Sequence, residues 1–178
     1  AFVSIAHPEW YSLTSEEALS VSHAHAVEIY NHGCAVACDR ADGAAMLDLL
    51  LSEGRHLIAI ATDDAHFTEP DHFGGWVMVK SMENSPEVLL QALKNGHFYS
   101  SEGPGLHHIE LEKNELTICS SAVSTVIVQG KGSATVALHG ASMTKSKIKL
   151  GRVSQSEWLR VTVRDAAGRR AWSNPIWR

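Results

Sequence analysis

Several features that would assign the chain to a common class of protein are absent from its 178 residues. No run of eighteen apolar residues occurs, which excludes an apolar membrane-spanning helix. The first residues contain no basic segment followed by an apolar block, so they are not a signal peptide, and a signal upstream of Ala1 stays open. A start on Ala1 rather than Met indicates a fragment or a processed product.

Cysteine is also scarce, with only Cys34, Cys38 and Cys119 in the chain. Three is an odd number, and the spacing forms neither a C-x-x-C pair nor a disulfide framework. We therefore expect reduced thiols that act as small buried residues. Reduced thiols favour the cytoplasm as the compartment.

Histidine, in contrast, is abundant, with 11 residues against 5 Trp and 3 Tyr. Residues 1–105 contain 4 Lys+Arg, 15 Asp+Glu and 8 of the histidines, a net charge of -11. Residues 106–178 contain 11 Lys+Arg and 5 Asp+Glu, a net charge of +6. Because carboxylate and neutral imidazole are usual ligands of divalent cations, the first part has the composition of a cation site. A solvated acidic surface explains the composition equally well.

The pattern of secondary structure changes near the same residue. Segments 2–6, 27–30, 57–61 and 76–79 have the character of strands and alternate with helix signals that begin at Thr14, Asp42 and Pro86. This order predicts a parallel sheet or part of an α/β barrel. Beyond residue 106, short alternating runs at 125–129, 134–138 and 158–163 predict an antiparallel sheet or small sandwich. We therefore place a domain boundary between residues 105 and 106.

Metal-type ligands follow two of the predicted strands. His7 comes directly after the first strand, and Asp63, Asp64 and His66 follow the strand over 57–61. In parallel α/β folds, side chains from different strands converge beyond the carboxyl ends of the strands. Asp64 and His66 are two residues apart, so in an extended segment they project to the same side. The two strand ends together favour a shared divalent cation over isolated polar residues.

Between these motifs lies a glutamate within an apolar strand. Glu28 is costly to bury unpaired, so it needs a partner, and it either binds a cation or orients a ligand histidine. His32, just past the end of that strand, is a further candidate ligand or a surface loop residue. His23 and His25 precede the strand, at its opposite end, and are interpreted as ordinary polar residues.

An ordered set of motifs resembles the later motifs of the PHP (polymerase and histidinol phosphatase) superfamily of metal-dependent phosphoesterases. The branch that it resembles most includes carbamate-hydrolysing members. The motifs are Ala6-His7-Pro8, Glu28-Ile29-Tyr30-Asn31, Ala61 to His66, Gly75-Trp76-Val77 and Gly96 to Pro104. The tail, with Trp158 to Val163, Asp165 to Gly168 and Trp172 to Trp177, is similar to the β extension of that branch.

The resemblance implies the C-terminal part of a distorted (β/α)7 barrel followed by a small antiparallel β domain. It also implies a cluster of divalent ions (zinc, manganese or iron) held by His7, Asp64 and His66, with Glu28 and His32 as less direct matches. Asp63 would orient an imidazole or assist proton transfer, or form only a turn hydrogen bond. The opening H-x-H motif of the family is missing, so the chain resembles the C-terminal portion of a longer enzyme and is expected to be inactive alone.

Two functional hypotheses follow from these residues. The first is hydrolysis of a phosphate ester or a related small ester by a metal-activated hydroxide. The alternative is a binding module for a glycan or protein partner, formed by the β domain with Trp158, Trp172 and Trp177, although aromatic residues in sheets are more often core. Neither hypothesis involves a membrane. We also expect no nucleic-acid binding, because Lys145, Lys147 and Lys149 lack interleaved aromatic residues, and we expect a homodimer through exposed barrel surface.

Overall fold

The computed structural model describes all residues from 1 to 178, which divide into two compact units, Ala1–Ser100 and Ser101–Arg178. The fold is mixed α/β, with a small parallel sheet and helices followed by a large curled antiparallel sheet.

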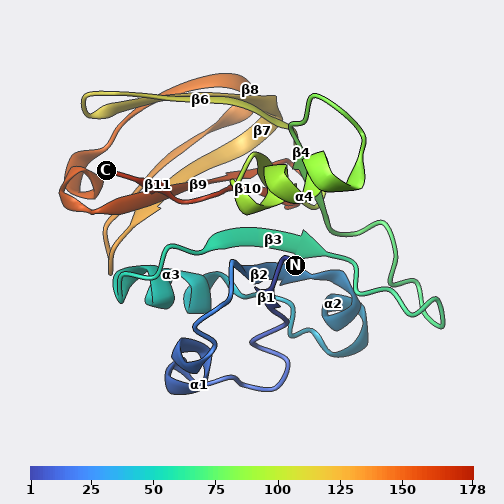
Figure 1. Ribbon diagram of the computed structural model, residues 1–178. Helices are drawn as coiled ribbons and strands as arrows, with labels where there is room; N and C mark the ends of the chain where they lie inside the picture. The colour runs from blue at the N-terminus through green and yellow to red at the C-terminus, as the bar shows by residue number, and fades with distance from the viewer. The chain divides into compact units, whose positions relative to one another are not determined.

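The first unit contains a three-stranded parallel sheet in the order β1-β2-β3. Its strands are β1 (Ser4–Ile5), β2 (Ala26–Asn31) and β3 (Ile58–Thr62). Helices α1 (Ser15–Ser20), α2 (His32–Cys38) and α3 (Ala44–Ser52) lie around this sheet (Figure 1). Every residue of β2 is buried, as expected of a parallel strand covered on both faces. The prediction of a parallel sheet is confirmed.

The three helix signals in the sequence each correspond to a helix, and one further helix was not expected. Thr14 caps α1 through a capping box with Glu17, and Pro86 opens α4 (Pro86–Lys94). Helix α2 was not expected, because its sequence contains a glycine and few strong helix formers. Its first turn is stabilised by Asn31, whose side-chain oxygen accepts a hydrogen bond from the backbone N–H of Cys34.

Strands β4 (Trp76–Val79) and β5 (Phe98–Ser101) correct one expectation. The strand over 76–79 was expected in the parallel sheet, but β4 and β5 are neighbours in the second sheet. Side chains from this segment still contribute to the core of the first unit, where Phe98 is buried with Ala26 and Ile60. Val77, Val79 and Leu93 pack against that cluster, so β4, β5 and α4 bury apolar surface of the parallel sheet.

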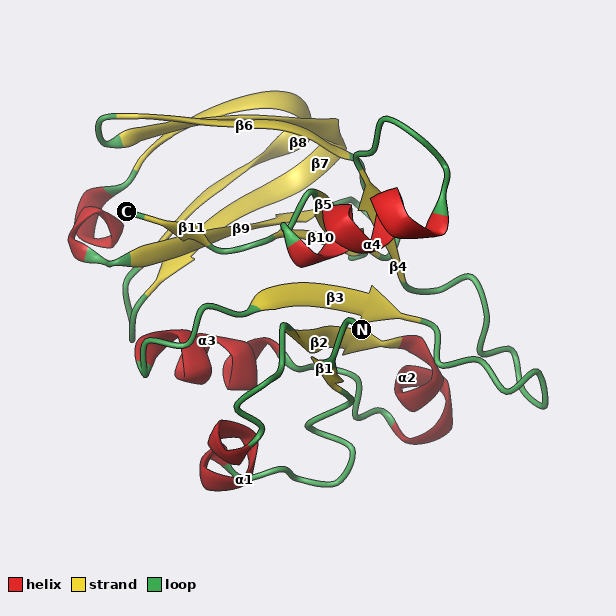
Figure 2. Ribbon diagram, in the orientation of Figure 1, coloured by secondary structure: helices red, strands yellow, loops and turns green.

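The second unit is a curled antiparallel sheet (Figure 2), as the alternating pattern predicted. It contains β6 (Leu106–Glu112), β7 (Glu115–Gly130), β8 (Thr135–Lys149), β9 (Trp158–Arg164), β10 (Arg170–Ser173) and β11 (Ile176–Trp177), with a 3₁₀ turn η1 (Gly151–Gln155). The first half of β7 lies between β6 and β8, and its second half lies between β9 and β8. Register shifts between Cys119 and Thr125 bend the β7–β8 ribbon at this change of neighbour.

The tryptophans of this unit mainly fill its core. Trp158 and Trp172 are 0% and 2% exposed, so these two side chains do not form a surface for stacking a ligand. None of the helices in the chain has the length and apolarity that a membrane crossing requires.

Candidate functional site

The carboxyl ends of the three parallel strands bring together most of the residues singled out in the sequence. Ala26 and Val27 of β2 pair with both outer strands, and Asn31 at the end of β2 is opposite Thr62 at the end of β3. His7 follows β1, His32 follows β2, and Asp63 and Asp64 follow β3. The candidate site is therefore at the edge of the sheet where parallel α/β folds usually bind ligands.

Glu28 connects all three strand ends through hydrogen bonds. Its Oε2 accepts from the backbone N–H of His7 at 2.6 Å and from Nδ2 of Asn31 at 3.0 Å. Its Oε1 accepts from the hydroxyl of Thr62 at 2.9 Å. Glu28 is buried, with only 7% of the residue exposed. The expectation that this buried carboxylate has partners is confirmed, and it contacts the backbone of His7 rather than the imidazole.

Asn31 is the central residue that the sequence reasoning missed. It is fully buried, and its Nδ2 donates both to Glu28 and to Oδ2 of Asp64, the latter at 3.2 Å. The amide therefore separates two carboxylates that would otherwise repel each other, and its oxygen caps α2. An asparagine directly after a buried strand and three residues before a helical amide is the signal that could have identified it.

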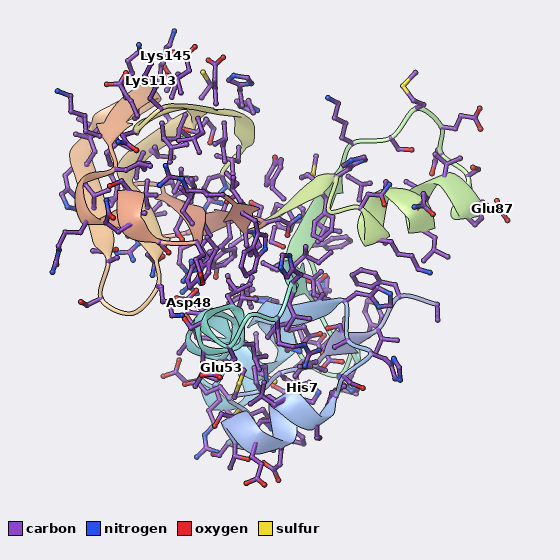
Figure 3. The ribbon with its side chains drawn as sticks, turned by 60° about the vertical axis from the view of Figure 1, so that its left-hand side comes forward. His7, Asp48, Glu53, Glu87, Lys113 and Lys145 are labelled. Atoms are coloured by element: carbon purple, nitrogen blue, oxygen red, sulfur yellow. The ribbon has the colours of Figure 1, made fainter.

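His7 has an unusual backbone and an unusual side chain. Its φ is 27°, a positive value that non-glycine residues rarely adopt, and Pro8 follows it. The Nδ1 atom is buried without a hydrogen-bond partner. The rings of Trp10 and Tyr11 pack edge-on against the imidazole, with ring centroids 5.1 and 5.3 Å from its own. In Figure 3, His7 lies within the first unit, among surrounding side chains. An orphaned imidazole nitrogen fits a position that a cation or a polar substrate atom occupies.

A cavity of about 400 Å³ lies at the strand ends. Its lining includes His7 and Trp10 from one side, Cys34 from α2, and Asp64 and His66 from the loop after β3. Three of the predicted ligands thus face one cavity. However, no three His, Cys, Asp or Glu side chains are grouped closely enough to hold a metal ion. Of the predicted ligands, His7, Asp64 and His66 line this cavity, so a cation bound here would need donors in addition to these three.

Asp63 organises a loop. Its Oδ1 accepts from the backbone N–H groups of Gly74 and Gly75, both at 2.8 Å, and its Oδ2 accepts from that of Phe73 at 2.6 Å. Burial raises the pKa of this carboxyl, but the three backbone hydrogen bonds outweigh burial and hold the pKa below its usual value. Asp63 therefore stays ionised and fixes the loop that returns to β4, the turn role that the sequence left open for it.

His32 is adjacent to this loop and does not line the cavity. Its Nδ1 is 3.0 Å from the hydroxyl of Tyr30, and the ring is packed closely against Gly74. A Cβ at Gly74 would be 2.1 Å from Nδ1 of His32, so any larger residue at that position would have to displace the ring. The structure thus places His32 between Tyr30 and the loop that Asp63 holds.

Asp71 positions His66 from the other side of the loop. It is only 4% exposed, and its carboxylate accepts from the backbone N–H groups of His66 and Phe67 at 2.7 and 3.2 Å. The hydrogen bond from His66 is the main reason that the pKa of the Asp71 carboxyl is lowered. The His66 side chain is 71% exposed, with Nδ1 3.7 Å from Asp71, so it extends to the mouth of the cavity.

Cys34 is the cysteine that lines the cavity. It is buried, whereas Cys38 is exposed and Cys119 is intermediate, so the expectation of buried thiols is correct only for Cys34. Burial raises the pKa of the Cys34 thiol to about 11, and the nearby Cys38, Asp64 and Glu28 add to this effect. Cys34 is therefore a neutral thiol in the cavity wall, not an activated nucleophile.

Comparisons with protein-family models, with curated proteins and with solved structures found no match to this chain.

Proposed function

We propose that the first unit supplies one wall of a divalent-cation site in a hydrolase that acts on phosphate esters or related small esters. In this proposal the unit corresponds to the C-terminal part of a PHP-type (β/α)7 barrel, as the motif resemblance implies. The observation that supports it best is that His7, whose buried Nδ1 has no hydrogen-bond partner, lines the same cavity as Asp64. Imidazole nitrogen and carboxylate oxygen together suit zinc, manganese or iron.

The residues at the strand ends have separate roles in this proposal. His7 and Asp64 would bind the cation, and His66 at the cavity mouth would bind a second cation or the substrate. Glu28 and Asn31 hold these two residues in place, because Glu28 fixes the backbone of His7 and Asn31 donates to Asp64. When bound, such a cation supplies a hydroxide nucleophile at neutral pH. Asp63 and His32 support the loop beside the cavity.

The number of donors sets the expected activity of the chain by itself. Since no three ligand side chains are grouped closely enough to hold an ion, additional ligands must come from outside these residues. We therefore expect weak cation binding and no turnover of a generic aryl phosphate by the isolated 178-residue chain. Robust hydrolysis that Asp64→Ala abolishes would contradict the proposal that further ligands are needed.

The test is titration calorimetry of the purified chain with Zn²⁺ and with Mn²⁺. His7→Gln and Asp64→Asn should each weaken binding by about tenfold or more, since each removes a donor. Asp39→Asn is the matched control: it makes the same change of charge at an exposed position that ends α2 in a left-handed conformation, which Asn tolerates. Equal affinity in all four proteins, or no binding at millimolar cation, would refute the cation site.

The alternative of a glycan-binding surface has less support. Trp158 and Trp172, two of the three aromatic residues that suggested it, are buried in the core of the second unit. Titration with sugars, in parallel with the cation titrations, separates the two hypotheses.

A further inference from the structure

Strand β8 leaves one long edge of the second sheet without a partner. It runs from Thr135 to Lys149, 15 residues, and pairs along its length only with β7. The backbone N–H and C=O groups on its other side have no partner strand. Natural proteins usually shorten or cover such an edge, because it is a template for another strand. Two stretches are regular, 135–139 and 145–149, on either side of the register shifts.

The charges on the outer face of the sheet are arranged in rows across three strands. Residues directly opposite in antiparallel strands point to the same face. The register therefore aligns Glu112 and Glu115 with Lys149, and it aligns Glu110 and Thr117 with Lys147. The remaining row contains His108, Cys119 and Lys145. Carboxylates thus follow β6 and ammonium groups follow β8, the strand at the open edge.

The open edge itself is purely basic. The 15 residues of β8 include three lysines and no Asp or Glu. Lys147 has an internal partner, the carboxylate of Glu115 at 3.6 Å. All three lysines are exposed, and Figure 3 shows Lys145 at the outer surface of the sheet, pointing away from the ribbon. An acidic strand placed outside β8 would therefore meet a row of positive charge.

We propose that β8 is a docking edge for an acidic extended segment of a partner protein, which adds to the sheet as a strand beside 145–149. Backbone hydrogen bonds would supply affinity, and carboxylates at alternate positions would pair with Lys145, Lys147 and Lys149. This inference concerns the second unit and does not depend on the proposed cation site.

Two other occupants of this edge are disfavoured by the same observations. A second copy of β8 would bring two edges of equal positive charge together. A nucleic acid lying on the lysines would also approach the carboxylates of Glu110, Glu112 and Glu115 on the same face. A peptide strand outside β8 is separated from those carboxylates by the width of the lysine row.

The experiment uses the full chain and a synthetic nine-residue peptide in which Glu alternates with Val. We expect saturable binding with a Kd below about 100 µM that weakens as salt is raised. The double variant Lys145→Glu, Lys149→Glu keeps the Lys147–Glu115 pair and should bind about tenfold more weakly. The control variant Lys80→Glu, Lys94→Glu changes the net charge equally at exposed positions of the first unit and should bind as the native chain does.

Two further peptides distinguish strand addition from simple charge attraction. They have the same sequence, one N-methylated at the Glu positions and the other at the Val positions. Because only alternate residues direct their N–H groups toward a neighbouring strand, one of the two should lose binding and the other should retain it. Equal binding of both would refute a docked strand. Three other results would also overturn the proposal. They are equal binding of a peptide with Lys in place of Glu, binding of a DNA oligonucleotide that competes with the peptide, and self-association of the chain that the Lys145→Glu, Lys149→Glu variant abolishes.

Discussion

The buried carboxylate of Glu28 allows the most quantitative test of the first unit. It accepts three hydrogen bonds, from His7, Asn31 and Thr62, that join the ends of three strands. Hydrogen bonds to a charged group contribute about 1.5–3 kcal/mol each, and neutral ones about 0.5–1.5 kcal/mol. Glu28→Gln retains an oxygen for His7 and Asn31 and turns its NH₂ toward the Thr62 hydroxyl, which can accept. We therefore expect the free energy of unfolding to fall by about 1–3 kcal/mol, because three hydrogen bonds to a charged group become hydrogen bonds to a neutral one.

Glu28→Ala removes every acceptor and leaves buried donors unsatisfied, so we expect a loss of about 4 kcal/mol or more. Thr62→Val is the control that removes only one hydrogen bond to the carboxylate, at about 1.5–3 kcal/mol. The measurement is amide hydrogen exchange of peptides from Ala26–Asn31, which follows the first unit separately from the second. If Glu28→Gln and Glu28→Ala lower the free energy of opening equally, or if neither lowers it by about 0.5 kcal/mol, Glu28 does not hold the three strand ends together.

Three further predictions concern the loop and the cavity wall. Because the pKa of Asp63 is lower in the folded state than in the unfolded chain, this carboxylate should stabilise the fold above about pH 4, and the stabilisation should be lost as the pH falls through the folded-state pKa. Asp63→Asn should remove this pH dependence, which is measured by hydrogen exchange of the Gly74 amide. Gly74→Ala places a Cβ against the His32 ring and should lower unfolding free energy by about 1–3 kcal/mol, seen in urea melts. At pH 8, iodoacetamide should modify exposed Cys38 much faster than Cys34, whose pKa is about 11; similar rates measured by peptide mass spectrometry would contradict the buried, neutral thiol.

Local signals in the sequence predicted the elements that local chemistry determines. The hydroxyl of Thr14 and the acid at Glu17 specify the start of α1, and Pro86 specifies the start of α4. The continuous apolar run over 57–61 predicted β3, and the mainly apolar segment over 27–30 predicted β2. These features depend on neighbours within a few residues, so an isolated sequence contains the information.

Features that depend on distant partners were not predictable in the same way. Helix α2 has weak helical propensity and is anchored by a tertiary contact, since the N–H of Gly33 donates to the carbonyl of Asp63 at 2.8 Å. A Cβ at Gly33 would be 3.2 Å from that carbonyl, so the glycine permits the approach. Strands β7 and β8 were expected as shorter runs, because polar residues and register shifts interrupt their alternation. Similarly, the groups that donate to the Asp63 carboxylate are backbone amides ten to twelve residues away, and no side-chain pattern marks them.

The backbone of His7 shows how the two kinds of information combine at the candidate site. The motif drew attention to the imidazole, but the fold holds this residue through its N–H, at 2.6 Å from a carboxylate 21 residues later. A non-glycine residue with φ of 27° costs about 1–3 kcal/mol, and a buried nitrogen without a partner adds to that cost. Glu28 offsets the strain by fixing the backbone, and nothing within the chain offsets the unpaired nitrogen. Under the proposed function, a ligand bound in the cavity that His7 and Asp64 line would remove this cost.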